Sequence, residues 1–239
     1  MVTLRLKPTK SSHGFTVLFL AFCSWGARAD TDAQSWMQFL SQGKLPSQVR
    51  LWTELQPRFG SGVGGLTTLL IRPAIGWQVT DDLSLWGGYA WAPLLKPTSR
   101  NEHRAWAQAI YVAQPFGGTF TQRLRMESRF FESASASAFR LRYQARLAIP
   151  VALENALSLV VYDEVFLSLN DASPVITSGF DQNRLFVGAF HRFSPQLAID
   201  IGYLWNAVRR PGAPENRTNH VIMLSLFHWF DFSRNAEVP

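Results

Sequence analysis

The sequence predicts an all-β protein, a single up-and-down antiparallel transmembrane β-barrel of about ten strands. Apolar and polar residues alternate with a period of two along most of the chain, which is the period of a strand with one face on each side of a sheet. Charged residues make up only 17% of the 239 residues, against about 25% in ordinary soluble domains. No apolar run approaches the roughly 20 residues that a membrane-spanning helix needs.

Residues 1–29 are predicted to be a signal peptide. Basic residues precede an apolar core at 15–25, and Ala27-Arg28-Ala29 fits a cleavage site after Ala29. Cleavage removes Cys23, the only cysteine, so the mature chain has neither a disulfide nor thiol chemistry. The remaining 19 basic and 17 acidic residues give little net charge, and we expect no nucleic-acid partner.

The mature chain is predicted to begin with a periplasmic segment, 30–48, that contains a short helix. Trp36, Phe39 and Leu40 have helical spacing there. The barrel follows at 49–232, and a tail at 233–239 ends the chain. The ten predicted strands fall at 49–59, 69–79, 83–91, 102–111, 123–130, 139–149, 157–168, 182–193, 197–206 and 222–232. The strand at 157–168 is apolar on both faces, so its phase stays open.

The connections between the predicted strands alternate in length. Short turns are expected at 80–82, 114–118, 150–156 and 194–196, and longer loops at 60–65, 92–101, 132–138, 169–180 and 207–218. Short turns belong on the periplasmic side of an outer-membrane barrel. An even number of strands would then leave both termini in the periplasm.

The composition of the two faces favours a membrane barrel. The polar face carries Arg, Gln, Gly, Glu and Trp, whereas the apolar face ends in aromatic residues at both sets of strand ends. Two aromatic rows around an aliphatic band are typical of the interfacial girdles of outer-membrane barrels. The alternative is a soluble lipocalin-like barrel or a sandwich, which also alternates. The predicted rows are Phe59, Tyr89, Trp91, Phe139, Tyr203 and Trp205 at one end and Trp77, Tyr111, Phe193 and Phe232 at the other.

The inward face is predicted to hold a polar network. Ten strands enclose a space that large side chains nearly fill, since about eight strands are just filled and wide channels need roughly 16. A packed plug of ion pairs is therefore expected, with a narrow anion-leaning pore as the alternative. The predicted members are Glu54, Glu102, Arg104, Gln108, Arg123, Arg125, Glu127, Arg129, Arg140, Arg142, Arg146, Glu164 and Arg184.

Charge predicts the register of the hairpin around 114–118. One register places Arg104 opposite Arg129, and directly opposed like charges are destabilising. The other places Glu102 opposite Arg129 and Arg104 opposite Glu127. We expect the second.

The sequence contains no recognisable catalytic motif. None of the four mature histidines is followed two residues later by serine, the pairing that would place a base beside a nucleophile on one strand. No metal-binding spacing and no phosphate-binding loop is present. We expect no cofactor, no metal and no enzymatic activity, with a membrane-embedded lipid hydrolase as the remaining alternative.

Eight short motifs occur in order along the chain: Trp52-x-Glu54, Pro57-Arg58-Phe59, Glu102-x-Arg104-x-Trp106-x-Gln108, Arg125-x-Glu127-x-Arg129, Phe139-Arg140-x-Arg142-Tyr143, Asp163-Glu164-x-Phe166, Phe180-Asp181-Gln182-Asn183-Arg184-Leu185 and Gly202-Tyr203-Leu204. They cover roughly 49–232 and resemble a bacterial family called domain of unknown function 2490. The resemblance implies an outer-membrane β-barrel and implies no catalytic residues. The chain departs from barrel-assembly signals, which end on an aromatic residue, because seven residues follow Phe232.

The sequence thus predicts an outer-membrane protein with a structural or passive role and a closed or narrow lumen. Its expected partners are outer-membrane lipid and, during insertion, periplasmic chaperones and the barrel-assembly machinery. The sequence leaves the oligomeric state open.

Overall fold

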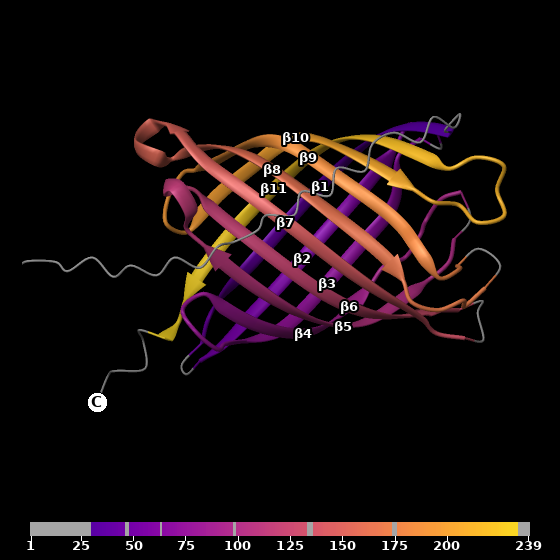
Figure 1. The fold of residues 1–239 in the computed structure, drawn as a ribbon, viewed down its shortest axis with the longest axis horizontal. Coiled ribbons are helices and arrows are strands. Elements are labelled where there is room, and N and C mark those ends of the chain that lie inside the picture. Colours follow the sequence, from indigo (N-terminus) through magenta and orange to yellow (C-terminus); the bar gives the residue numbers. More distant parts are fainter. Residues whose placement is uncertain are drawn as a thin grey trace, which may run out of the picture.

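Eleven β-strands close into one barrel, each hydrogen-bonded to two neighbours (Figure 1). The computed structural model describes residues 30–45, 48–62, 64–97, 99–132, 136–173 and 176–233. The predicted signal peptide at 1–29 and most of the tail lie outside these residues. The strands are β1 (Asp30–Lys44), β2 (Val49–Gly60), β3 (Leu66–Gln78), β4 (Leu83–Trp91), β5 (Glu102–Ala113), β6 (Thr119–Phe131), β7 (Ala138–Ala152), β8 (Leu157–Ser168), β9 (Gly179–Arg192), β10 (Leu197–Val208) and β11 (Arg217–Asp231).

The helix predicted around Trp36 is wrong, because this segment is strand β1. The structure describes only two 3-10 turns, η1 (Pro115–Gly117) and η2 (Leu153–Asn155), besides the strands. No helix in the described part is long and apolar enough to cross a membrane. The strand forms here because β2 and β11 would otherwise each leave one edge of backbone groups unpaired, and β1 satisfies both edges.

β1 is one strand more than the ten predicted, and it sets the end of the barrel at which the described chain begins. β1 pairs antiparallel with β2 but parallel with β11, so Asp30 lies beside Arg217 and Lys44 beside Asp231. The termini of the barrel therefore lie at opposite ends, and the prediction of both termini on one side is wrong. An odd number of strands requires this, because each strand reverses the direction of the chain.

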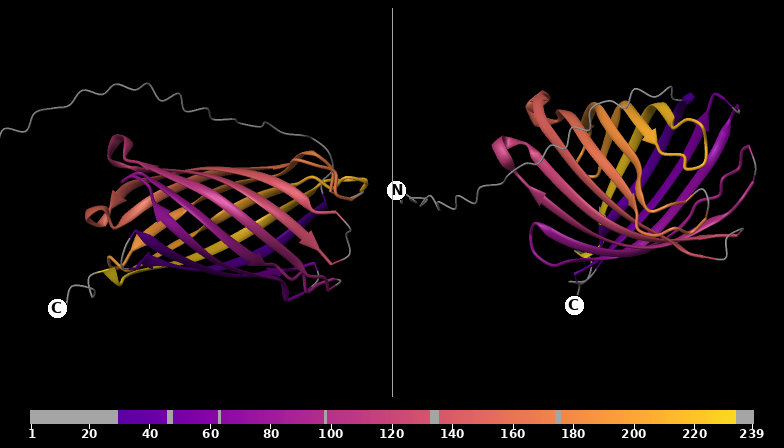
Figure 2. Two further views of the ribbon diagram at one scale, coloured as in Figure 1. Left: turned by 90° about the horizontal axis from the view of Figure 1, so that it is seen from below. Right: turned by 45° about the vertical axis from the view of Figure 1, so that its right-hand side comes forward.

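The two ends of the barrel differ in their connections. We call the end with 61–65, 92–101, 132–137, 169–178 and 209–216 the long-loop end, and the end with 45–48, 79–82, 114–118, 153–156 and 193–196 the short-turn end. The observed connections follow the predicted alternation closely. Asp30 lies at the long-loop end and Asp231 at the short-turn end. Figure 2 shows the strands inclined in one sense to the long axis of the barrel.

Alternation along the strands separates an inner face from an outer face. On β8, Ser158, Val160, Tyr162, Glu164 and Phe166 alternate inward and are buried, which settles the phase of this strand. Every strand except β5 exposes large apolar side chains outward. The predicted aromatic rows lie on this outer face. Exposed members include Tyr89, Trp91, Phe139 and Tyr203 toward the long-loop end and Trp77, Phe193 and Phe232 toward the short-turn end.

The register between β5 and β6 differs from the prediction. Arg104 lies opposite Arg129 in the ladder. The predicted register, with Glu102 opposite Arg129 and Arg104 opposite Glu127, is therefore wrong. The opposed arginines are compensated diagonally, because Glu102 Oε1 is 2.7 Å from Arg104 Nε and 2.5 Å from Arg129 Nε. Long side chains thus form ion pairs between residues that are not directly opposite each other in the ladder.

Candidate functional site

The predicted polar network lies inside the barrel. The structure places all thirteen predicted members on inward positions of β2, β5, β6, β7, β8 and β9, where each is buried or half-buried. Strand alternation fixes this placement, since the members of each strand are separated by even numbers of residues. Large polar side chains from six strands therefore meet in one enclosed volume.

Two buried carboxylates organise the centre of the network. Glu127, which is 1% exposed, lies 2.5 Å from Arg140 Nη2 and 2.6 Å from Arg142 Nη1. Glu164 accepts from Arg142 at 2.7 Å and from Arg123 at 2.8 Å. Arg142 therefore joins the two carboxylates. Charge-assisted hydrogen bonds of this length are strong and directional, so the cluster fixes β6, β7 and β8 relative to one another.

Arg125 contacts the same cluster from β6. It is fully buried, and its Nη1 lies 3.8 Å from Glu127 Oε1. Its Nε and Nη2 donate to Gln108 Oε1 at 2.8 and 2.5 Å. The guanidinium also lies 4.4 Å from the ring centre of Trp106. Arg125 is thus held by one amide, one aromatic face and a longer ion contact.

The structure adds four charged residues that the predicted set omits. Arg72 lies 2.7 Å from Glu54, Asp181 3.1 Å from Arg140, and Asp200 3.0 Å from Arg146. Arg58 donates to Gln56. Strand alternation alone places Arg58, Arg72 and Asp200 inward, so the sequence could have identified these three members. Asp181 lies at a register shift between β8 and β9, which the sequence does not reveal.

Two aromatic side chains fill the space between these charges. Trp36 of β1 lies between two guanidinium groups, with Arg58 at 3.8 Å and Arg184 at 5.0 Å from its ring. Phe166 has Arg142 at 4.4 Å and Arg184 at 4.6 Å from its ring. Both aromatic residues are almost fully buried. Cation–π contacts with desolvated arginines are each worth about 2 kcal/mol or more. The packed rings and guanidinium groups also leave little space inside the barrel.

Part of the remaining lumen is apolar. Tyr162 and Phe186 stack with ring centres 4.8 Å apart, beside Leu204 and Val221. The Phe186 ring lies over the paired glycines of β9 and β10, Gly188 and Gly202. A Cβ atom on Gly188 would come within 2.4 Å of the backbone oxygen of Ile201. Glycine is required at this position because the ring and the neighbouring backbone occupy the space.

The lumen carries an excess of positive charge. The charged residues described above comprise ten arginines and six carboxylates, and buried charges of one sign are costly without partners. Hydrogen bonds to amides and contacts with rings compensate part of the excess. The arginines are Arg58, Arg72, Arg104, Arg123, Arg125, Arg129, Arg140, Arg142, Arg146 and Arg184, and the carboxylates are Glu54, Glu102, Glu127, Glu164, Asp181 and Asp200.

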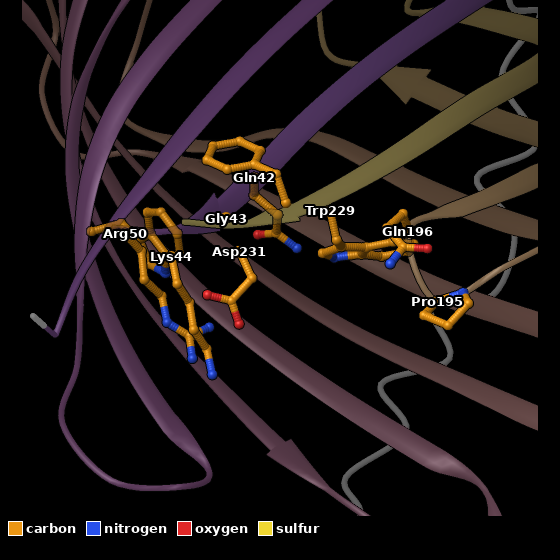
Figure 3. A pocket seen from close by; sticks show the side chains of 10 residues that line it. Gln42, Gly43, Lys44, Arg50, Pro195, Gln196, Trp229 and Asp231 are labelled. Carbon is orange, nitrogen blue, oxygen red and sulfur yellow. The ribbon is translucent and has the colours of Figure 1, made fainter. Parts of the chain in front are cut away.

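A cavity of about 460 Å³ opens at the short-turn end. Figure 3 shows Lys44, Arg50 and Asp231 on one side of it and Trp229 with Gln196 on the other. The residues that line the cavity carry both charge signs. The segment around Trp36 does not cover this mouth, because it is part of the barrel wall.

Three histidines on the outer face contact tyrosine or serine hydroxyl groups near the aromatic rows. His103 pairs with Tyr89 and His220 with Tyr203, both toward the long-loop end. Toward the short-turn end, His228 Nδ1 lies 2.9 Å from the Ser41 hydroxyl across the β1–β11 seam. Within the described ranges, no three His, Cys, Asp or Glu side chains are placed to hold a metal ion.

At the long-loop end, Glu132 joins two neighbouring connections. Its carboxylate accepts from the backbone N–H of Asn101 at 3.2 Å and from the Asn101 side chain at 2.7 Å. These hydrogen bonds, the side-chain one first, lower the pKa of Glu132 from its usual value. Glu132 is exposed and lies outside the packed lumen.

Comparison with known proteins gives a family without an assigned activity. A family model described as "Protein of unknown function (DUF2490)" matches residues 33–218. An uncharacterised protein of Methylorubrum extorquens is 32% identical over 216 residues, which cover 87% of this chain and 94% of the relative.

Proposed function

Since the chain belongs to the family of proteins of unknown function DUF2490, whose description names no activity, we propose a function from the geometry of the barrel and from the sequence. The protein is an integral outer-membrane β-barrel with a structural role and a lumen closed to solutes. The observation that carries the proposal is the inverted polarity of the barrel, which has ion pairs inside and exposed apolar side chains outside.

The outer face supports insertion in a membrane. Its exposed side chains include Ile75, Val187 and Ile222, each more than half exposed, between the two aromatic rows. Soluble monomers rarely expose apolar patches larger than a few hundred Å². A closed barrel also leaves no strand edge unpaired, as the hydrocarbon core of a bilayer requires.

The interior supports a closed lumen. A water-filled channel would expose the side chains that line it, whereas Arg125 and Phe166 are 0% exposed and Glu127 is 1% exposed. These residues come from β6 and β8, and Trp36 enters the lumen from β1 on the other side of the barrel. Eleven strands are also closer to the filled barrels of about eight than to the channels of roughly 16. A narrow anion-leaning pore is therefore the less supported alternative.

The predicted signal peptide supports export, and the loop lengths give the orientation. Short turns face the periplasm in outer-membrane barrels, so the long-loop end would face outward and the cavity near Asp231 inward. The partners in this proposal are outer-membrane lipid and the chaperones and assembly machinery that insert barrels. The proposal includes no cofactor and no nucleic acid.

Two measurements test the proposal. Carbonate-washed outer membranes should retain the protein, and unboiled protein should migrate differently from boiled protein on a gel, as a folded barrel does. Recovery in the soluble periplasm would contradict insertion. Planar-bilayer recording in molar salt should give no large stable conductance. Porin-sized, anion-selective steps that weaken in Arg125→Ala and Arg146→Ala variants would overturn the closed lumen and favour the pore.

The main proposal assigns no catalytic activity, but one contact favours a second candidate. Ser41 and His228 form a nucleophile–base pair at hydrogen-bond distance on the outer face. They lie near the aromatic row of the short-turn end, the depth at which lipid ester groups meet water. Sequence reasoning missed this pair because its members lie 187 residues apart.

The chemistry would be ester hydrolysis. The Ser41 oxygen would attack the ester carbonyl while its proton passes to His228, and the departing alcohol would take that proton as its bond to carbon breaks. Water would then release the fatty acid and restore the serine. Release of labelled fatty acid from phospholipid vesicles tests this. Activity lost in Ser41→Ala and kept in Ser35→Ala would support it, and no release by the wild type would exclude it.

A further inference from the structure

One carboxyl group lies where the barrel is otherwise apolar. Asp163 is near the middle of β8 and points outward, because its neighbours Tyr162 and Glu164 point into the lumen. Along the outer face of β8 it is flanked by Val161 and Val165. Among the outward positions of the eleven described strands, it is the only Asp, Glu, Lys or Arg.

A second polar residue stands beside this carboxyl group. Asn183 of β9 donates to Asp163 Oδ1 at 2.5 Å and to the backbone oxygen of Glu164 at 3.3 Å. The cross-strand partner of Asp163 on β7 is Ala145, whose single methyl group extends little above the sheet. Tyr143 is nearby but donates its hydroxyl away from Asp163, to β6. The carboxyl group therefore keeps hydrogen-bonding capacity toward the surrounding membrane.

A polar group at this depth is costly when it faces lipid alone. Ionisable side chains inside a membrane are rare and generally pair with one another or face protein. Hydrogen bonds between polar side chains are also a principal attraction between membrane segments, because lipid supplies no competing partner. The outer face of β7–β9 carries the one outward carboxyl group of the described strands, which gives it a physical reason to be covered by protein.

We propose that a second copy of this chain covers the outer face of β7–β9, with the Asp163 side chains of the two copies in contact. The proposal rests on the proposed membrane insertion. Two copies inserted in the same direction and related by a two-fold axis along the membrane normal place equal residues at equal depth. A second copy therefore presents a hydrogen-bonding group at the depth of Asp163, whereas an unrelated membrane protein need not have a polar group at that depth.

The contact is chemically self-complementary. A neutral carboxyl group both donates and accepts a hydrogen bond, and an apolar surrounding favours this neutral form. Two Asp163 groups can therefore exchange reciprocal O–H···O bonds. Asn183 already donates to Asp163 and holds the side chain in place. Leu185, exposed beside Asp163 on β9, would supply apolar contact around the polar pair.

Cysteine cross-linking in membranes tests the proposal. A full-length Cys23→Ser background removes the only native thiol. Ala145→Cys, beside Asp163, should give a dimer with a short bismaleimide. The matched control is Thr53→Cys, exposed on the outer face of β2, which lies nearly opposite β8 in the strand order. The control should stay monomeric.

Two substitutions at Asp163 make the test specific. Asp163→Leu removes the hydrogen-bonding group from a lipid-facing position and should weaken dimerisation about tenfold. Asp163→Asn keeps a group that both donates and accepts, so it should retain the dimer. No cross-linked dimer with Ala145→Cys, or an equal yield with Asp163→Leu, would overturn the proposal. Carbonate-resistant recovery and the unboiled gel shift report insertion separately, so a monomeric inserted barrel contradicts the dimer alone.

Discussion

Replacing Glu127 with glutamine should strongly destabilise the barrel without changing the shape of the side chain. Glu127 is 1% exposed and accepts from Arg140 at 2.5 Å and from Arg142 at 2.6 Å, with Arg125 at 3.8 Å. The substitution leaves three buried guanidinium groups near a neutral amide. Removal of one partner from a buried ion pair typically costs about 3–5 kcal/mol.

The structure places the expected loss at the lower end of this range. Arg142 keeps Glu164 at 2.7 Å, and Arg140 keeps Asp181 at 3.1 Å. Only Arg125 loses its sole carboxylate contact among the described residues, and it keeps Gln108. We therefore expect the free energy of unfolding of Glu127→Gln to fall by about 3 kcal/mol.

Urea unfolding of the protein in lipid vesicles, followed by tryptophan fluorescence, measures this loss. The matched control is Glu132→Gln on the exposed turn at the long-loop end, where the hydrogen-bonded partner is Asn101 rather than an arginine. The control should change the free energy by less than about 1 kcal/mol. A folded Glu127→Gln barrel within about 1 kcal/mol of the wild type would refute the view that ion pairs hold the lumen together.

Three further predictions concern packing and topology. Trp36→Ala should lower the free energy of unfolding by about 3–5 kcal/mol in the same urea assay, because it leaves a cavity at the β1–β11 seam. Gly188→Ala should cost about 1–3 kcal/mol through overpacking, whereas Gly87→Ala, with nothing within 4 Å of an added Cβ, should not destabilise the barrel. In a Cys23→Ser background, Thr31→Cys should react with a membrane-impermeant thiol reagent on intact cells and Ser233→Cys should not; the reverse pattern would contradict the assigned orientation.

Local patterns predicted most of the fold because the period of a strand is local. The run at 139–149 placed Arg140, Arg142 and Arg146 inward, as the structure has them. The error at β1 has a physical cause: Trp36, Phe39 and Leu40 have the spacing of a helix face, while the demand for a closing strand comes from β2 and β11. Tertiary pairing therefore overrode the local signal.

The network's membership was easier to predict than its contacts. Strand alternation places a side chain inside the barrel, but it does not say which neighbour a long arginine reaches. Glu102 binds Arg104 along its own strand and Arg129 across the ladder. The predicted register assumed that only directly opposed residues interact. Cross-seam contacts such as Ser41 with His228 depend on closure and are not visible in any short stretch of sequence.

The parallel seam determines when the barrel can be completed. Every other strand pair joins neighbours in the sequence, whereas β1 and β11 are separated by 187 residues from Asp30 to Arg217. Closing so long a loop carries a large entropic cost, and contacts between distant parts of a chain form slowly. The first strand must therefore stay available until the last has been made. Until then both seam edges are open to pairing with other chains, so an assembly factor that shields these two edges would act on the closure of the barrel.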